Sequence, residues 1–356
     1  MRISKPPSGM PSSIANHNYS TNQNTYKMDT LLNTIMPAPA IEAGVALPNQ
    51  SNQSFIVANT KSIELAEVRD THIIPVFPAT NEPLISHYQL IESVADIVLQ
   101  EFPMDRIMEP SIRVSHPIKG RIPEAKHKKA SELEPWEETL YYERMMFTME
   151  IPTITSDVAG NQLSLSIGAV KAYNLDNVYS KRTNMGQQFK LFIGFQNRVC
   201  TNLCVSTDGF LHETQITSIG QLQYAIRHLI QQYRIEDDVK QLSSLEKVHL
   251  TETQFAQVMG RARMFKHLPE GDSSGILPIL LGDQQLGMVV KNYYEDYNFS
   301  RSRDGSISLW RMHNLLTGAN KSTYIDQFLD RAVNATDFVV ELTKDITGSK
   351  QSWYLG

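Results

Sequence analysis

The sequence predicts an α+β fold, in which a small antiparallel sheet with a strand-strand-strand-helix core precedes a helical C-terminal half. Segments in which apolar and polar residues partly alternate occupy the middle of the chain, between residues 141 and 195. Apolar residues recur at helical spacing on both sides of these segments, over 86–101 and again from residue 219 onward. Strands and helices thus form separate blocks, which argues against a doubly wound nucleotide-binding sheet.

The composition is that of a globular protein, with 356 residues, of which 41% are hydrophobic and 20% charged. The net charge of −5 gives no overall basic field that would attract nucleic acid. Two cysteines, Cys200 and Cys204, are too few for a disulfide framework and indicate a reducing cytoplasm. No segment approaches the ~18 apolar residues of a membrane-spanning helix, and the first residues contain no apolar signal-peptide core. We therefore expect a cytoplasmic protein without a membrane partner.

Three regions follow from changes in composition along the chain. Residues 1–53 are rich in Ser, Asn, Pro and Gln and predict a disordered tail. Residues 54–240 predict an α+β domain with a central antiparallel sheet, and residues 241–356 predict a helical region packed on it. An apolar stretch in the tail, at 28–36, is either a short docking helix or an unstructured apolar patch.

Capping sequences mark three helix starts, at Ser86, Ser218 and Thr251. Each is followed three residues later by Gln, so the hydroxyl and the amide can satisfy free backbone N–H groups reciprocally. The first helix ends near Glu101, because Pro103 cannot continue it. Further helices are expected over 286–297, 308–317 and 322–345, with Gly318 as a C-cap.

Three strands are expected over 141–151, 162–173 and 189–195, and the third could extend to Cys200. The sequence DVAGN at 157–161 suits a turn between the first two strands. In the second strand, leucines and an isoleucine alternate with serines and a glycine, which is typical of a strand with one buried face.

The segment from Arg113 to Lys129 is the most basic part of the chain, since six basic residues and one glutamate give a charge of +5. Pro117, Gly120 and Pro123 predict a loop or an irregular arm rather than a helix. Five glutamates follow between residues 132 and 143. The two runs either pair or are simply solvated, or else the basic run contacts phosphates.

A second basic cluster spans residues 171–198, where five cations and one aspartate give a charge of +4. A sheet that presents cations to phosphates and an aromatic ring to bases can hold a single strand without reading its sequence. The alternative is that these cations only protect strand edges. The residues predicted to bind nucleic acid are Arg113, Lys119, Arg121, Lys126, Lys128, Lys129, Lys171, Tyr173, Lys181, Arg182, Lys190 and Arg198.

The sequence contains no familiar catalytic or cofactor motif. GxxxxGK[ST], GxGxxG after a strand, HExxH and GxSxG are all missing. Cys200 and Cys204 could bind zinc with histidines such as His212 and His228, but a thiol pair without a matching second pair is a weak zinc signal. We expect both thiols to pack as small apolar groups. The predictions are accordingly no enzymatic activity, no cofactor and no metal.

Two segments resemble a known family. RVCTNLCV at 198–205 resembles the "VC-N-L" signature of phage/plasmid-like proteins of unknown function. The segment SLWRMHNLLTGANKSTYIDQFLDRA at 308–332 resembles their Leu-Trp-x-x-x-Asn-x-x-Thr motif, here Leu309, Trp310, Asn314 and Thr317. The resemblance covers roughly residues 80–345 and implies a bacterial mobile element, without an assigned biochemistry. We expect structural roles for Asn202, as a cap of the turn after the strand, and for Trp310, as a core anchor.

The strand-strand-strand-helix order also resembles the core of phage single-strand annealing proteins, which is an analogy of fold alone. Together with the basic clusters it favours a non-enzymatic protein that binds or anneals single-stranded DNA and forms a homo-oligomer. The alternative is an interaction protein of a phage or plasmid that binds a host protein. The acidic net charge and the apolar stretch in the tail favour this alternative.

Overall fold

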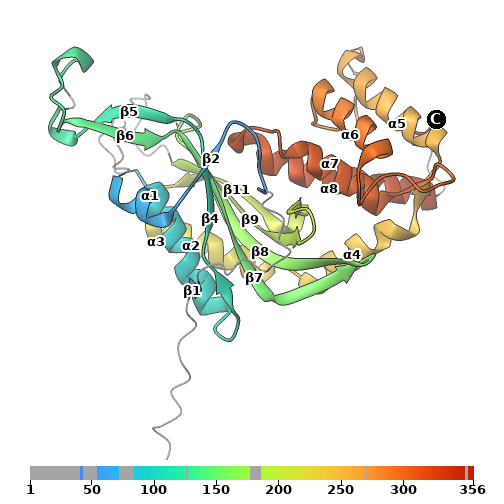
Figure 1. Cartoon of the computed structure of the whole chain (residues 1–356), viewed down its shortest axis with the longest axis horizontal. Helices are drawn as coiled ribbons and strands as arrows, with labels where there is room; N and C mark the ends of the chain where they lie inside the picture. The colour runs from blue at the N-terminus through green and yellow to red at the C-terminus, as the bar shows by residue number, and fades with distance from the viewer. Residues whose placement is uncertain are drawn as a thin grey trace, which may run out of the picture. The chain divides into compact units, whose positions relative to one another are not determined.

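The central strands of the chain pair as an antiparallel sheet, as Figure 1 shows. The computed structural model describes residues 41–42, 54–71, 84–125, 127–176, 186–269, 271–348 and 352–356, all of them in the compact unit formed by residues 39–356. The strand order is β10-β9-β8-β7-β4-β2, and β11 also pairs with β9. These strands are β2 Lys61–Ile63, β4 Ser111–Val114, β7 Arg144–Val158, β8 Asn161–Ala172, β9 Gln187–Asn197, β10 Leu203–Cys204 and β11 Phe210–Ile216.

The predicted α+β fold is confirmed, and the sheet extends beyond the three expected strands. Its longest strands, β7 and β8, form a hairpin at the position expected from the sequence. Ala159 and Gly160 make the turn with φ of 53° and 77°, and the Asp157 carboxylate accepts a hydrogen bond from the Gly160 N–H at 3.0 Å. Two consecutive residues with positive φ give a turn whose twist matches that of the flanking strands.

Helices cover both faces of the central strands. Alternate residues of β7, β8 and β9, such as Phe147 and Leu191, belong to a core shared with α2 and α3. The intervening residues, such as Met146 and Phe192, belong to a second core shared with α8. Because side chains alternate between the two faces of a strand, these cores lie on opposite faces of the sheet. The covering helices are α2 His87–Glu101, α3 Ile219–Gln232 and α8 Ile325–Thr347.

The other helices follow the predicted pattern of a helical C-terminal half. Ser86 and Thr251 form the reciprocal capping boxes expected at the starts of α2 and α5. The expected C-cap at Gly318 is wrong, because α7 continues to Asn320. The remaining helices are α1 Leu65–Thr71, α4 Ile235–Ser244, α5 Glu252–Met264, α6 Asp283–Glu295 and α7 Leu309–Asn320. In the part of the chain that the structure describes, no helix has the length and apolar character needed to cross a membrane.

Three two-stranded pairs complete the secondary structure. β5 (Pro117–Arg121) and β6 (Glu138–Tyr142) pair antiparallel and extend away from the main sheet (Figure 1). We call residues 117–142 the arm. Its base is a regular β-ribbon, which corrects the expectation of a loop or an irregular segment. The other pairs are β1 Ile41–Glu42 with β3 Ile107–Met108, and β12 His249–Leu250 with β13 Ile307–Ser308.

We expect Gly168→Ala to lower the free energy of unfolding by about 1–3 kcal/mol, because overpacking a close-packed site forces its neighbours to shift. A Cβ at Gly168 would lie 2.0 Å from the Phe147 carbonyl oxygen and 2.8 Å from the Phe192 ring. Gly220→Ala in the first turn of α3 is the matched control. Its Cβ would meet no atom within 4 Å, so a stabilisation of about 0.5–1 kcal/mol is expected. Urea unfolding of both variants measures the contrast, and equal stabilities would refute the close strand packing.

Candidate nucleic-acid interface

Two of the residues predicted to bind nucleic acid, Lys171 and Tyr173, lie in the core. The Lys171 side chain has no exposed surface, and its ammonium lies 2.5 Å from the Asp176 carboxylate. Burial lowers the pKa of Lys171 to about 8, although the Asp176 charge acts in the opposite direction. The ring of Tyr173 is buried 4.6 Å from the ring of His87, and burial raises the pKa of its hydroxyl.

Neither residue can reach a phosphate or a base while the helices cover the sheet. Lys171 instead ties the segment after β8 to β9, because its ammonium also donates to the Gln187 amide oxygen at 3.3 Å. The Asp176 carboxylate accepts a further bond from the Gln188 N–H at 2.8 Å. This is the arrangement expected of a buried ion pair, whose remaining polar atoms need hydrogen bonds of their own.

The other sheet cations have protein partners as well. Lys190 is buried and its ammonium lies 2.5 Å from the Asp330 carboxylate of α8. Arg198 bonds Gln162 at 3.0 Å and lies 3.6 Å from the Glu150 carboxylate. Arg113 donates hydrogen bonds to Thr60 at 2.9 Å. Lys181 and Arg182 lie outside the described residues.

The arm brings the basic run and the glutamates that follow it together. Lys119 and Glu138 form an exposed ion pair at 3.0 Å, and Lys128 lies 2.5 Å from Glu137. Arg121 donates to the carbonyl of Lys128. Lys129 is exposed and its side chain has no ion pair within the described residues. Lys126 lies outside the described residues.

The arm also carries two exposed apolar side chains that the sequence interpretation missed. Trp136 is 71% exposed and Leu140 is 45% exposed. Leu140 lies opposite Lys119 in the β5–β6 register, so both side chains lie on the same face of the ribbon. A tryptophan close to the basic run was the signal in the sequence, because cations and an aromatic ring together can hold a single strand.

Residues 198–205 and residues 308–332 meet in the structure. Buried side-chain amides form hydrogen bonds that join the turn between β9 and β10 to α7. Asn197 donates to the Asn314 side-chain oxygen at 3.2 Å, and Asn202 donates to the Asn314 carbonyl at 2.9 Å. Asn314 in turn donates to the Trp310 carbonyl at 2.9 Å. Asn202 is therefore structural, but it bonds to α7 instead of capping the turn as expected. The cap is Asn197, whose side-chain oxygen accepts a hydrogen bond from the Val199 N–H at 3.0 Å. Trp310 is buried, as expected of a core anchor.

The turn between β9 and β10 contains a residue with a strained backbone, and a lysine of the α7 end forms hydrogen bonds with the turn. Thr201 adopts a φ of 58°, which a β-branched residue rarely takes. Lys321, at the end of α7, donates to the Cys200 carbonyl and to the Thr201 hydroxyl, the latter at 2.9 Å. The neighbouring helix residue Trp310 is buried, and its indole N–H donates to the Asn161 side chain at 2.8 Å.

Both cysteine side chains pack against the hydrophobic core, as expected for small apolar groups. Cys204 is buried, and burial raises the pKa of Cys200 to about 11. A thiol with a raised pKa is a poor nucleophile at neutral pH. Within the described ranges, no three His, Cys, Asp or Glu side chains are grouped closely enough to hold a metal ion.

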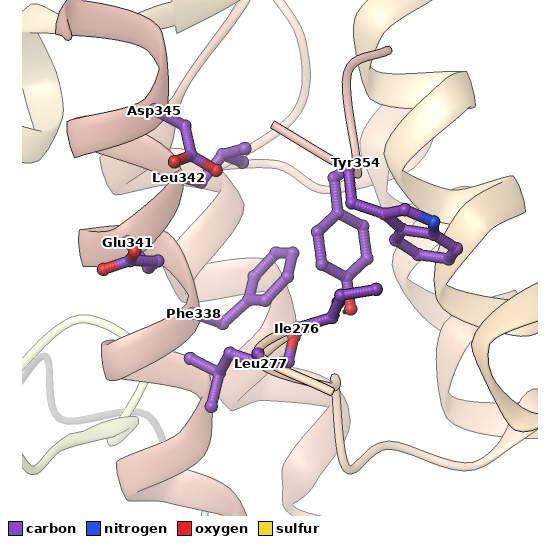
Figure 2. Close-up of a pocket in the computed structure, with 9 residues that line it drawn as sticks. Ile276, Leu277, Phe338, Glu341, Leu342, Asp345 and Tyr354 are labelled. Atoms are coloured by element: carbon purple, nitrogen blue, oxygen red, sulfur yellow. Dashed lines mark hydrogen bonds between the residues drawn. The ribbon is translucent and has the colours of Figure 1, made fainter. Parts of the chain in front are cut away.

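A cavity of about 180 Å³ lies between α8 and the C-terminal residues (Figure 2). Phe338 and Tyr354 form its aromatic wall, with ring centroids 4.8 Å apart, and the Tyr354 hydroxyl donates to the Leu277 carbonyl at 2.8 Å. Glu341 and Asp345 of α8 lie at its border. The hydrogen bond and the ring contact give this site a structural role, which is to hold the end of the chain against α8.

Comparison with known proteins gives a match along most of the chain. Residues 38–355 match the sequence model of a family described as "Domain of unknown function, B. Theta Gene description (DUF3871)". No curated protein and no solved structure gives a significant match.

We expect the stability of the protein to fall between pH 6.5 and about pH 4 because of His313. This side chain is buried in α7 beside Thr336, and burial lowers its pKa from 6.5 to about 4. In this window the unfolded chain takes up a proton that the folded protein excludes, so the free energy of unfolding falls by up to about 3 kcal/mol as the pH decreases. His313→Gln removes this contribution.

The control for this prediction is His228→Gln, which changes an exposed histidine of α3. Urea unfolding at several pH values between 7 and 4 measures each profile. His228→Gln should keep the pH dependence of the unsubstituted protein, and His313→Gln should flatten it. Parallel profiles for both variants would show that His313 does not titrate as its burial requires.

Proposed function

We propose that this chain is a non-enzymatic protein that binds and anneals single-stranded nucleic acid. It belongs to the DUF3871 family of unknown function. The observation that carries the proposal is the arm, where Lys119, Lys129 and Trp136 are all exposed. Cations and an exposed aromatic ring are the two groups that sequence-independent binding of single strands requires. The resemblance of residues 198–205 and 308–332 to phage/plasmid-like proteins supports an origin on a bacterial mobile element.

The arm suits this role better than the sheet does. The ammonium of Lys119 pairs with Glu138 only at the surface, where such a pair contributes about 0–1 kcal/mol. A phosphate can therefore displace the glutamate at little cost. Lys171 would instead have to leave the buried carboxylate of Asp176, which costs several kcal/mol. Lys190 is itself buried, and its ammonium is held by the Asp330 carboxylate.

The exposed aromatic ring of the arm also favours binding of a single strand over a duplex. A two-stranded ribbon presents side chains of alternate residues on each face, and one face carries Lys119 and Leu140. Bases stack on an exposed aromatic ring only when they are unpaired, because the rings of a duplex already stack on one another. Annealing requires two strands to be held together, so we propose that the protein acts as a homo-oligomer in which several arms follow the strands.

We expect the double variant Lys119→Ala/Lys129→Ala to bind single-stranded DNA more weakly and with a flatter salt dependence. Loss of two phosphate contacts on a single strand should reduce the slope of log K against log salt by about 1.4. Fluorescence anisotropy with a labelled oligonucleotide of about 40 nucleotides, which spans several sites of ~4–16 nucleotides, measures both quantities.

The matched control for this double variant is Lys240→Ala/Lys247→Ala, which removes two exposed lysines outside the arm. It should leave the slope unchanged. Equal effects of the two double variants would mean that the protein attracts DNA without a site. No binding of the unsubstituted protein at low salt would favour the alternative, a mobile-element protein that binds a host protein.

We expect Trp136→Ala to weaken binding of the single strand by about 1–3 kcal/mol while leaving the salt slope intact, because stacking is not a charge interaction. The exposed Tyr297→Ala, far from the arm in sequence and 98% exposed in the structure, is the control. A change in slope, or an equal loss in both variants, would exclude stacking on Trp136.

A further inference from the structure

A groove of about 610 Å³ lies between α2, the segment around β2 and the start of β4. Its floor is apolar and is formed by Ile91, Ala95 and Leu99 of α2 together with Ile63 and Ile112 from the strands. The three α2 residues lie at spacings of four, so they form one stripe along the helix. The groove is open on the protein surface, and its volume is in the range of sites that hold ligands or partner segments.

The rim of the groove is acidic. Glu64, Glu92, Asp96 and Glu109 border it, and all four side chains are exposed. No lysine or arginine is among the described residues that line the groove. The cations nearest in sequence to the β2 wall pair with other carboxylates, Lys61 with Glu67 at 3.3 Å and Arg69 with Asp70 at 2.6 Å.

The negative charges of these carboxylates do not stabilise the fold. Glu92 and Asp96 are four residues apart on α2, where two like charges destabilise a helix by about 0.2–0.5 kcal/mol. Within the described residues, Glu92 accepts one long hydrogen bond, from the Tyr88 hydroxyl at 3.4 Å. The Asp96 and Glu109 carboxylates form no hydrogen bond or ion pair with the described part of the chain. Interfaces place opposite charges against each other. An apolar groove whose rim carries only negative charge therefore suits a partner that carries positive charge.

We propose that this groove binds a cationic amphipathic helix of a partner protein. The apolar face of the helix would lie on Ile91, Ala95 and Leu99, and its lysines or arginines would pair with the rim carboxylates. The lining stripe of α2 from Tyr88 to Leu99 covers eleven residue steps, or roughly 16 Å at the helical rise. That length corresponds to about three turns of a bound helix.

The acidic rim disfavours three other occupants. Nucleic acid is repelled by carboxylates, so the groove is separate from the nucleic-acid function proposed for the arm. A second copy of this chain, which has a net charge of −5, offers no general charge complement. A metal ion is not favoured, because the described residues contain no group of three ligating side chains.

The test uses the full chain and a fluorescently labelled amphipathic peptide of leucine and lysine, about five turns or 18 residues long. Fluorescence anisotropy should detect binding that weakens with salt. The double variant Glu92→Gln/Asp96→Asn should bind about five- to tenfold more weakly, as loss of two exposed ion pairs predicts. Ala95→Trp, which fills the floor, should abolish binding.

Two controls decide whether the groove is the site. The double variant Glu236→Gln/Asp237→Asn removes the same charge from exposed positions of α4 and should bind within about twofold of the unsubstituted chain, since isolated surface charges contribute little. A peptide of the same composition in scrambled order should bind weakly. Equal losses in both double variants, or equal binding of the scrambled peptide, would overturn the proposal.

The experiment also separates this proposal from the function of the arm. The Lys119→Ala/Lys129→Ala chain should bind the peptide as the unsubstituted chain does. If Ala95→Trp does not fold, as judged by circular dichroism, the two charge variants still decide the outcome. Unchanged peptide affinity in Glu92→Gln/Asp96→Asn would overturn the proposal regardless of the result for DNA.

Discussion

The arrangement of the sheet and the C-terminal helices depends on the amide network that joins the β9–β10 turn to α7. Asn197, Asn202 and Asn314 are buried, and each amide is bonded to a group on the facing segment or on its own helix. A buried amide without a partner costs about 1–3 kcal/mol, so the turn and the helix stabilise each other only when both are in place. The network thus gives the contact a defined geometry that apolar packing alone would not provide.

The covering helices have consequences for the charged residues of the sheet. Because α8 covers one face, and α2 and α3 cover the other, the buried cations on either face can persist only with carboxylate partners. Asp330 of α8 supplies this partner for Lys190. Near the same end of the sheet, Asp176 does so for Lys171. Lys171 and Lys190 are therefore part of the scaffold, while the arm, which extends away from the sheet, keeps Lys119 and Lys129 exposed to water.

Local features of the fold could be predicted from the sequence because their causes are local. A helix cap and a tight turn each depend on interactions between residues only a few positions apart. The caps at Ser86 and Thr251 and the turn at 159–160 are found where the sequence predicts them. The coverage of the sheet could not be predicted. Ser164 and Ser166 gave β8 the alternation of a strand with one solvent-exposed face, yet both serines are fully buried.

Which of the predicted site residues are exposed could not be foreseen, for the same reason. A lysine in a strand is exposed or buried according to what packs above it, and the partner of Lys190 is 140 residues away in the sequence. Trp136 was overlooked because glutamates surround it in the sequence. The acidic groove was overlooked because its walls come from residues 62–66, 88–99 and 109–112, which only the fold brings together.

The arm and the groove differ in the sign of their charge, and this difference determines which ligand each can take. Fields of exposed charges are screened over about 8 Å at physiological salt, so each surface acts mainly on the ligand that touches it. A cationic helix in the groove would therefore neutralise the rim carboxylates without changing the affinity of the arm for a single strand. Linkage then requires a strand on the arm to leave the affinity of the groove for its helix unchanged as well.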